Sequence, residues 1–280
     1  MPELPEVETM RRGIAHVAGA KIVSVQRTPS PRRPISITPR IDRLNCRAAG
    51  QRIASVDRLG KRVVLRLESD DRIVIEPRMT GLVLIGKPPT TEHLRLRITL
   101  SGRNNPDVLF WDQRGLGVVT MLSADDYHEK LMTGKIGPDA CEIVLDDFLA
   151  RVGDSQSAIK VVLLDQSRVA GIGNLYASEM LHVAGIDPRQ RANRLNRGQW
   201  QRLHTAMQEI LNAAIEFEGS TLSDGTYRNA LNEAGNYQSH HRVYDRAGEP
   251  CKKCGPKSKI VRIVQAQRST FWCSQCQKKR

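Results

Sequence analysis

The second and third residues of the chain, Pro2 and Glu3, could together carry out covalent chemistry. Met1 precedes a small residue, so we expect its removal, which would leave the secondary amine of Pro2 at the N-terminus. Such an amine can attack an aldehyde or the C1′ atom of a sugar and form an iminium. The carboxyl group of Glu3 could move protons beside it. The dipeptide taken alone is better explained as an ordinary helix start, because many proteins begin with Met-Pro.

Four of the six cysteines form a second candidate site in the last part of the chain. They are Cys251, Cys254, Cys273 and Cys276, in the pattern C-x2-C-x18-C-x2-C. Each pair can place its thiolates on one tight turn, and two such turns complete a tetrahedral zinc site. Two disulfides are the alternative. The acidic N-terminus lacks the apolar segment of a signal peptide, so we expect a cytoplasmic chain with reduced thiols and one structural Zn²⁺.

The charge of the chain indicates a polyanionic partner. Lys plus Arg number 43 against 30 for Asp plus Glu, which gives a formal net charge of +13. Residues 242–280 hold 11 of the basic residues and two acidic ones, so +9 of the charge lies there. Nucleic acid is the simplest such partner, although a merely basic surface would have the same composition. No stretch is long and apolar enough to span a membrane.

The elements that must position these residues change in character along the chain. Residues 5–18 have apolar residues at helical spacing. Residues 21–121 contain short apolar runs separated by turns, which predicts a sandwich or barrel without a parallel sheet. The clearest runs are 22–25, 63–67, 73–75, 82–85, 94–100 and 118–121.

After residue 122 the apolar spacing becomes helical again. A helix is expected to start at Ser123, and others cover 145–152, 157–165 and 197–217. Residues 218–241 are rich in Gly, Asn, Ser and Asp and indicate a long functional loop. In the cysteine module, 260–264 and 270–273 should form a β-hairpin joined by 265–269, with Arg268 near its tip.

Three separated motifs resemble the bacterial formamidopyrimidine-DNA glycosylase family, in its oxidised-purine branch. The first is the opening MPELPEVET, and the second is GIGNLYASE at 171–179, which is similar to the family's helix-two-turns-helix motif. The third is QRSTFWC at 267–273. The resemblance runs from end to end and implies an α+β multidomain fold. Its parts are an N-terminal helix plus antiparallel β-sandwich (1–121), a helical helix-two-turns-helix domain (122–241) and a β-hairpin zinc finger (242–280).

The resemblance also implies an activity and its residues. The protein would be a bifunctional DNA glycosylase and AP lyase that excises 8-oxoguanine and formamidopyrimidines in base excision repair. Pro2 would form a Schiff base with C1′, Glu3 would assist ring opening, and β,δ-elimination would cleave the strand. Lys61 and Arg268 match residues that hold phosphates around the lesion. The other implied DNA contacts are His93, Lys160, Asn174 and Tyr244, together with the void-filling residues Met79, Arg114 and Leu116.

Two of these contacts have an alternative. Lys160 could be a solvated lysine on an otherwise apolar helix, and Tyr244 could pack in the core. Double-stranded DNA with oxidised bases is the expected partner, and a monomer associated with the bacterial nucleoid is the expected state.

The sequence departs from the family pattern at several points. Leu116 stands where an aromatic wedge is usual, and Glu76-Pro77-Arg78 replaces a histidine, a leucine and a glycine. The loop 219–227 is about two residues longer than usual and lacks an expected basic residue, which leaves the lesion preference open. The endonuclease VIII branch for oxidised pyrimidines is an alternative, but Leu4 replaces its usual glycine. A non-catalytic DNA-binding zinc protein on the same scaffold is another, and it predicts loss of Pro2 or Glu3.

Overall fold

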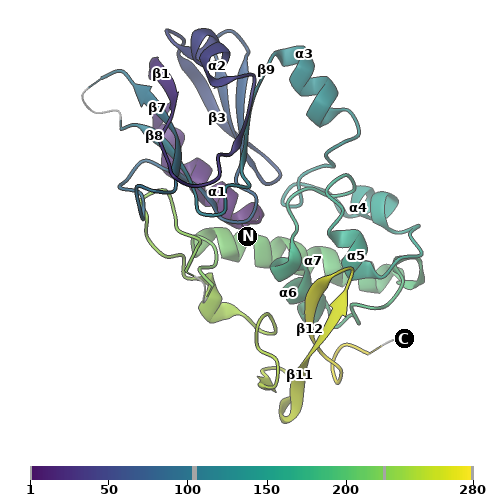
Figure 1. Ribbon diagram of the computed structural model, residues 1–280. Coiled ribbons are helices and arrows are strands. Elements are labelled where there is room, and N and C mark those ends of the chain that lie inside the picture. The colour runs from purple at the N-terminus through teal and green to yellow at the C-terminus, as the bar shows by residue number, and fades with distance from the viewer. Residues whose placement is uncertain (1, 103–105, 223–224, 279–280) are drawn as a thin grey trace. The chain divides into compact units, whose positions relative to one another are not determined.

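The computed structural model describes residues 2–102, 106–222 and 225–278 of the chain. It divides into two compact units (Figure 1). Unit 1 combines residues 1–133 with 215–238, and unit 2 combines 134–214 with 239–280. The three-domain division predicted from chain order stays a prediction.

Unit 1 begins with helix α1 (Leu4–Ile14), which continues into a 3₁₀ turn (Ala15–Val17). Val7, Met10 and Ile14 lie on one face and are fully buried, so the helix expected at 5–18 is confirmed. Behind it lie two sheets, ordered β1-β7-β8-β6 and β2-β9-β5-β4-β3. Their strands are β1 (Ile22–Arg27), β2 (Ser36–Thr38), β3 (Ile53–Leu59), β4 (Arg62–Leu67), β5 (Arg72–Glu76), β6 (Gly81–Leu84), β7 (Leu94–Leu100), β8 (Val108–Asp112) and β9 (Val118–Leu122).

The predicted sandwich is confirmed, because side chains from α1 and from both sheets share one hydrophobic core. One expectation was wrong: β2 pairs with β9 in parallel, although the other strand pairs are antiparallel. The pair is only three residues long and lies at a sheet edge, where no crossover pattern announces it. The apolar runs also missed β3, β8 and the short helix α2 (Ile41–Ala48).

Unit 2 consists of helices, among them most of the 20-residue α7, and the finger. The helices of the second half of the chain are α3 (Ala124–Tyr127), which still belongs to unit 1, α4 (Leu145–Val152), α5 (Ile159–Leu163), α6 (Asn174–Ala184) and α7 (Arg197–Glu216). Ser123 caps α3 by accepting a hydrogen bond from the Asp126 amide. A π-helical turn (His128–Met132) and 3₁₀ turns (Ala192–Arg194 and Tyr237–His240) complete the list. None of the helices in the described ranges could cross a membrane.

The finger sheet has the order β10 (Pro250–Cys251), β11 (Gly255–Gln265) and β12 (Arg268–Cys273). Ala266 and Gln267 both have positive φ, 45° and 60°, which is the backbone of a two-residue type I′ hairpin turn. The expected five-residue connection at 265–269 was therefore too long. Arg268 opens β12 directly after the tip, and β12 packs beside α6 (Figure 1).

Candidate active site and nucleic-acid interface

Pro2 and Glu3 lie at the start of α1, and both are buried. Glu3 is the N-cap residue and is 4% exposed, so its carboxyl group is largely removed from water. Apolar residues of α1 anchor the helix in the sandwich core, which fixes the position of its first turn. The pair is therefore held at a rigid helix end, next to the amides that favour negative charge.

Glu6 belongs to this site, although the sequence analysis did not single it out. One of its carboxylate oxygens, Oε2, accepts a hydrogen bond from the Glu3 amide at 2.8 Å, as part of a capping box. The other, Oε1, accepts from the Ser220 amide at 2.9 Å. Glu6 is 3% exposed and thus joins the candidate nucleophile segment to the start of the loop 219–227.

The loop 219–227 packs tightly where the structure describes it; Ser223 and Asp224 lie outside the described residues. Gly219 has φ of +78°, and an added Cβ would lie 2.9 Å from the Glu6 side chain, so only glycine fits there. Tyr227 is 4% exposed and donates its hydroxyl to the Glu218 carbonyl at 2.9 Å. The same hydroxyl lies 3.5 Å from the Glu6 carbonyl, so both ends of the loop contact α1.

Lys61 lies in the two-residue turn between β3 and β4, where Gly60 has φ of +55°. This turn is tied to α1: Arg58 donates to the Gly60 carbonyl at 3.2 Å and pairs with Glu8 at 3.0 Å. Burial raises the pKa of Glu8, but hydrogen bonds and ion pairs with Arg11, Arg12 and Arg58 lower it to about 2. Glu8 is therefore an anion at neutral pH, and it connects α1 to the Lys61 turn.

The predicted void-filling residues lie on two connections of unit 1. Met79, 37% exposed, follows Arg78, whose φ is +59°. Arg114 is exposed and Leu116 is half-buried, both between β8 and β9. His93, predicted as a DNA contact, is 9% exposed and packs edge-on against the Trp111 ring at 5.4 Å.

In unit 2, Lys160 and Asn174 come together with the finger hairpin. The Lys160 ammonium donates to Asn174 Oδ1 at 2.7 Å, to the Ser269 carbonyl at 3.0 Å and to Thr270 Oγ1 at 2.7 Å. Asn174 Nδ2 donates to the same Ser269 carbonyl at 2.9 Å. Lys160 is 1% exposed, so the solvated-lysine alternative was wrong. Lys160 thus joins the first residue of α6 to Ser269 and Thr270 of β12, next to the hairpin turn.

Glu179, quoted in the second motif without a role, anchors the segment that leads into the finger. Its carboxylate accepts hydrogen bonds from the amides of Arg242, Val243 and Tyr244 at 2.8–2.9 Å. It is fully buried, and this burial raises its pKa against the opposing effect of the amides. Tyr244 packs edge-on against Phe271 at 5.2 Å, so its core-packing role is observed, and its DNA contact stays a prediction.

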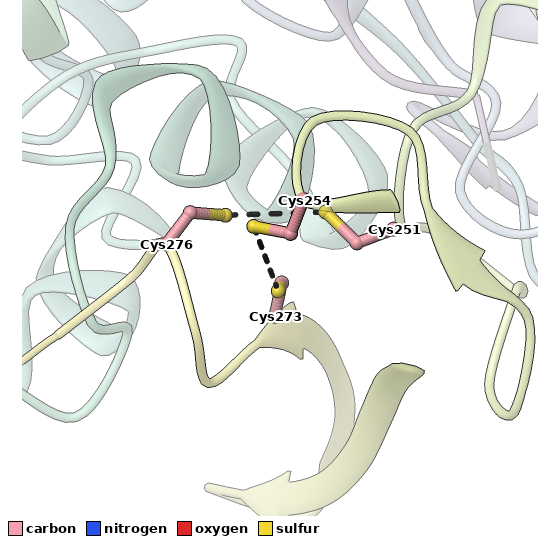
Figure 2. Close-up of side chains that lie close together, drawn as sticks. All are labelled: Cys251, Cys254, Cys273 and Cys276. Carbon is pink, nitrogen blue, oxygen red and sulfur yellow. Dashed lines mark hydrogen bonds between the residues drawn. The ribbon is translucent and has the colours of Figure 1, made fainter. Parts of the chain in front are cut away.

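The four cysteines fit a zinc ion. Their Sγ atoms all lie within 4.8 Å of one another, with Cys251–Cys276 at 4.0 Å and Cys254–Cys273 at 3.9 Å (Figure 2). Tetrahedral Zn–S bonds of about 2.3 Å require sulfur separations close to these values. Gln277 accepts from the Cys273 amide at 2.8 Å and donates to the Ile186 carbonyl at 2.9 Å, which attaches the site to the α6 end. The finger holds one structural zinc.

Three family matches cover the chain. They are the formamidopyrimidine-DNA glycosylase N-terminal domain over residues 1–119, the H2TH domain of that enzyme over 136–226, and the zinc finger found in FPG and IleRS over 248–279. Among curated relatives, formamidopyrimidine-DNA glycosylases of Chloroflexus aurantiacus and Chloroflexus aggregans are 37% and 38% identical. Each alignment covers 99% of this chain and 98% of the relative.

Solved structures are similar over the same length. Thermus thermophilus MutM (Fpg) has a TM-score of 0.85 and 34% identity, covering 99% of this chain and 98% of the other. A Lactococcus lactis Fpg mutant in complex with Fapy-dG DNA has a TM-score of 0.86 and 31% identity, covering 99% and 100%. Because these matches extend over nearly the whole sequence, the chain belongs to the formamidopyrimidine-DNA glycosylase family.

Proposed function

We propose that the protein is a bifunctional DNA glycosylase and AP lyase that removes oxidised purines from double-stranded DNA. The observation that carries the proposal is the buried Pro2-Glu3 pair at the start of α1, joined through Glu6 to the loop 219–227. Family membership supports the substrate class, since relatives carry the name formamidopyrimidine-DNA glycosylase. The Lactococcus lactis relative was crystallised with Fapy-dG DNA and with abasic-site DNA.

The chemistry starts at the amine of Pro2, after removal of Met1. Its nitrogen forms a bond to C1′, the glycosidic bond breaks, and the base leaves with a proton. Glu3 protonates the ring oxygen as the sugar opens, which completes the iminium. The iminium acidifies the C2′ proton, so β-elimination expels the 3′ phosphate and δ-elimination the 5′ phosphate. Hydrolysis of the remaining iminium by water then releases the sugar fragment as an unsaturated aldehyde and restores the amine.

DNA is held by groups of both units. Lys61 of unit 1, and Asn174 and Arg268 of unit 2, are the proposed phosphate contacts. Asn174 is the first residue of α6, and the N-terminus of a helix favours anions such as phosphate. The basic residues of 242–280 add an attraction that does not depend on sequence and that weakens with salt.

Borohydride trapping tests the proposal. The purified protein is mixed with duplex DNA carrying 8-oxoguanine opposite cytosine, or an abasic site, and then reduced. We expect a covalent adduct, mapped to Pro2 by mass spectrometry of the N-terminal peptide. A wild-type protein that forms no adduct with either duplex would refute the enzyme proposal. A duplex with an oxidised pyrimidine distinguishes the two branches of the family. Faster excision of the pyrimidine than of 8-oxoguanine would favour the endonuclease VIII branch.

A conservative variant tests the role of Glu3. Glu3→Gln should slow 8-oxoguanine excision by about 10²–10⁴-fold, the range for loss of a general acid–base group. Glu68→Gln is the matched control, because Glu68 is exposed in the same unit. Equal rates for the two variants would remove Glu3 from the mechanism.

We further propose that the protein acts as a monomer in the cytoplasm, with the nucleoid. The reduced thiols that a zinc finger needs support this compartment. Light scattering during size-exclusion chromatography of the zinc-loaded protein measures the oligomeric state, and a stable dimer would contradict the monomer.

A further inference from the structure

We propose that Asp112 is a positioning residue that braces the two void-filling segments, 79–81 and 113–117, into one rigid unit. The inference rests on the proposed function, because it concerns the insertion of Met79, Arg114 and Leu116 into the duplex. It adds a residue that the sequence argument did not single out. Asp112 is the last residue of β8 and is fully buried.

The carboxylate of Asp112 binds both segments at once. Oδ1 accepts from the Thr80 hydroxyl at 2.6 Å and from the Arg114 amide at 3.2 Å. Oδ2 accepts from the Gly117 amide at 2.7 Å. The Arg114 amide also donates to the Thr80 hydroxyl at 3.0 Å, which closes the network between the two segments. The bonded groups thus include Arg114 itself and immediate neighbours of Met79 and Leu116.

The backbone around Asp112 is tightly packed, and two glycines next to it have no space for a side chain. Gly81 pairs with Asp112 across β6 and β8, and a Cβ on Gly81 would lie 2.5 Å from the Pro77 carbonyl oxygen. A Cβ on Gly117 would lie 2.5 Å from the Phe110 ring, and one on Gly81 would lie 2.8 Å from the same ring. Both segments therefore pack on opposite parts of one buried side chain as well as on one carboxylate.

Arg95 supports the brace from the neighbouring strand. This arginine is 2% exposed, and its Nε donates to the Asp112 carbonyl at 2.8 Å. It lies in β7, and its Nη1 donates to the Ser30 hydroxyl at 2.7 Å. A buried cation next to a buried carboxylate reduces the cost of removing that carboxylate from water. The anchor is thus charge-compensated and belongs to the sheet rather than to the loops.

The arrangement suits insertion into DNA. The tips, Met79 and Arg114, are exposed, whereas the groups that hold their backbones are buried. Extruding a base costs a few kcal/mol. Side chains that fill the vacated space offset this cost only if their backbone does not move away. Segments fixed in advance lose less conformational entropy on insertion. Leu116 lacks the ring stacking of an aromatic wedge, so this chain depends more on the rigid support.

Asp112→Asn tests the brace with almost no change of shape. An amide NH₂ would then face one of the hydroxyl or amide donors, so at least one segment loses its anchor. The first readout is single-turnover excision of 8-oxoguanine opposite cytosine. The second is cleavage of an abasic site in single-stranded DNA, where no void forms. The third is the fluorescence of 2-aminopurine placed opposite an abasic analogue, which reports void filling directly.

We expect duplex excision to fall by about tenfold, as for other buried donors that lose their acceptor, while single-strand cleavage changes by less than about twofold. The 2-aminopurine signal should shrink, and the discrimination between opposite bases should weaken. Asp57→Asn is the control, because Asp57 is exposed on β3 of the same unit. Equal behaviour of the two variants, or an equal loss in both cleavage assays, would overturn the proposal.

Thr80 gives an independent test if Asp112→Asn folds poorly. Thr80→Val removes the hydroxyl and should reproduce the selective loss in duplex DNA, whereas Thr80→Ser keeps it and should restore excision. Failure of the serine variant to restore what valine removes would overturn the brace. Failure of the proposed function is distinguishable, because the wild-type protein would then cleave neither duplex nor single-stranded DNA.

Discussion

The two compact units stabilise their sites in different ways, and two buried glutamates make the difference clear. In unit 1, Glu8 is surrounded by Arg11, Arg12 and Arg58, which lower its pKa to about 2. In unit 2, Glu179 accepts hydrogen bonds from three backbone amides, and burial raises its pKa against the opposing effect of these amides and of the Arg242 charge. Arginine side chains thus keep Glu8 of unit 1 charged. Unit 2 relies on backbone amides, a buried lysine and a metal ion.

The two units also carry different proposed functional residues. Unit 1 holds the Pro2-Glu3 pair, the loop 219–227 and the proposed void-filling segments, whereas unit 2 holds Asn174, Arg268 and the zinc site. Loss of the metal or of the buried lysine should therefore weaken the hold on DNA more than the chemistry. The predictions that follow test that division, from the largest expected effect to the smallest.

Loss of a zinc ligand should have the largest effect. Cys273→Ser, or treatment with a chelator, removes the energy that folds the finger, because metal binding and folding are coupled in such sites. We expect duplex affinity to fall by about a hundredfold, and the salt dependence of binding to become shallower. Zinc content and a binding titration measure both. Cys141→Ser is the control, since Cys141 lies outside the four-cysteine cluster.

The division between the units fails if the zinc-free protein, at saturating concentration, no longer cleaves single-stranded abasic DNA. That result would place part of the chemistry in the finger.

Replacement of Lys160 should have an intermediate effect. Lys160→Met keeps the length of the side chain but leaves the Asn174, Ser269 and Thr270 oxygens without their ammonium donor. We expect the free energy of unfolding to fall by about 2 kcal/mol and DNA affinity by about tenfold. Thermal unfolding and a binding titration measure these losses, with the exposed Lys135→Met as control. An unchanged affinity would show that Asn174 and the finger tip need no such support.

The Glu8 cluster should change stability without a comparable loss of DNA affinity, so its total effect is the smallest, and it depends on pH. The pKa of Glu8 is lowered in the folded state from 4.5 to about 2. Its contribution is therefore complete above about pH 4.5 and disappears as the pH falls through about 2. Glu8→Gln should lower the free energy of unfolding by about 2 kcal/mol at pH 7, and the difference from wild type should shrink towards pH 2. A difference independent of pH would contradict the assigned charge state.

Most of the fold could be predicted from local patterns. Apolar spacing located α1, α4, α5 and α7 and six strands, because helix and strand periods are visible in short windows. The patterns missed β2, a three-residue strand that gains stability only from its neighbour β9. They also overestimated the hairpin connection, because a type I′ turn at Ala266-Gln267 lacks the glycine that usually marks one.

Only part of the candidate site, too, could be predicted from the sequence. The sequence by itself determined the zinc ligands, whose spacing fixes their geometry, and the Pro2-Glu3 pair, whose chemistry depends on residue type. Only the tertiary structure decided the roles of Glu6, Asp112, Lys160 and Glu179. Each makes hydrogen bonds to residues far away in the sequence, such as Ser220, Thr80, Ser269 and Arg242. A buried polar group takes its function from the partners that satisfy it, and those partners are brought together only by folding.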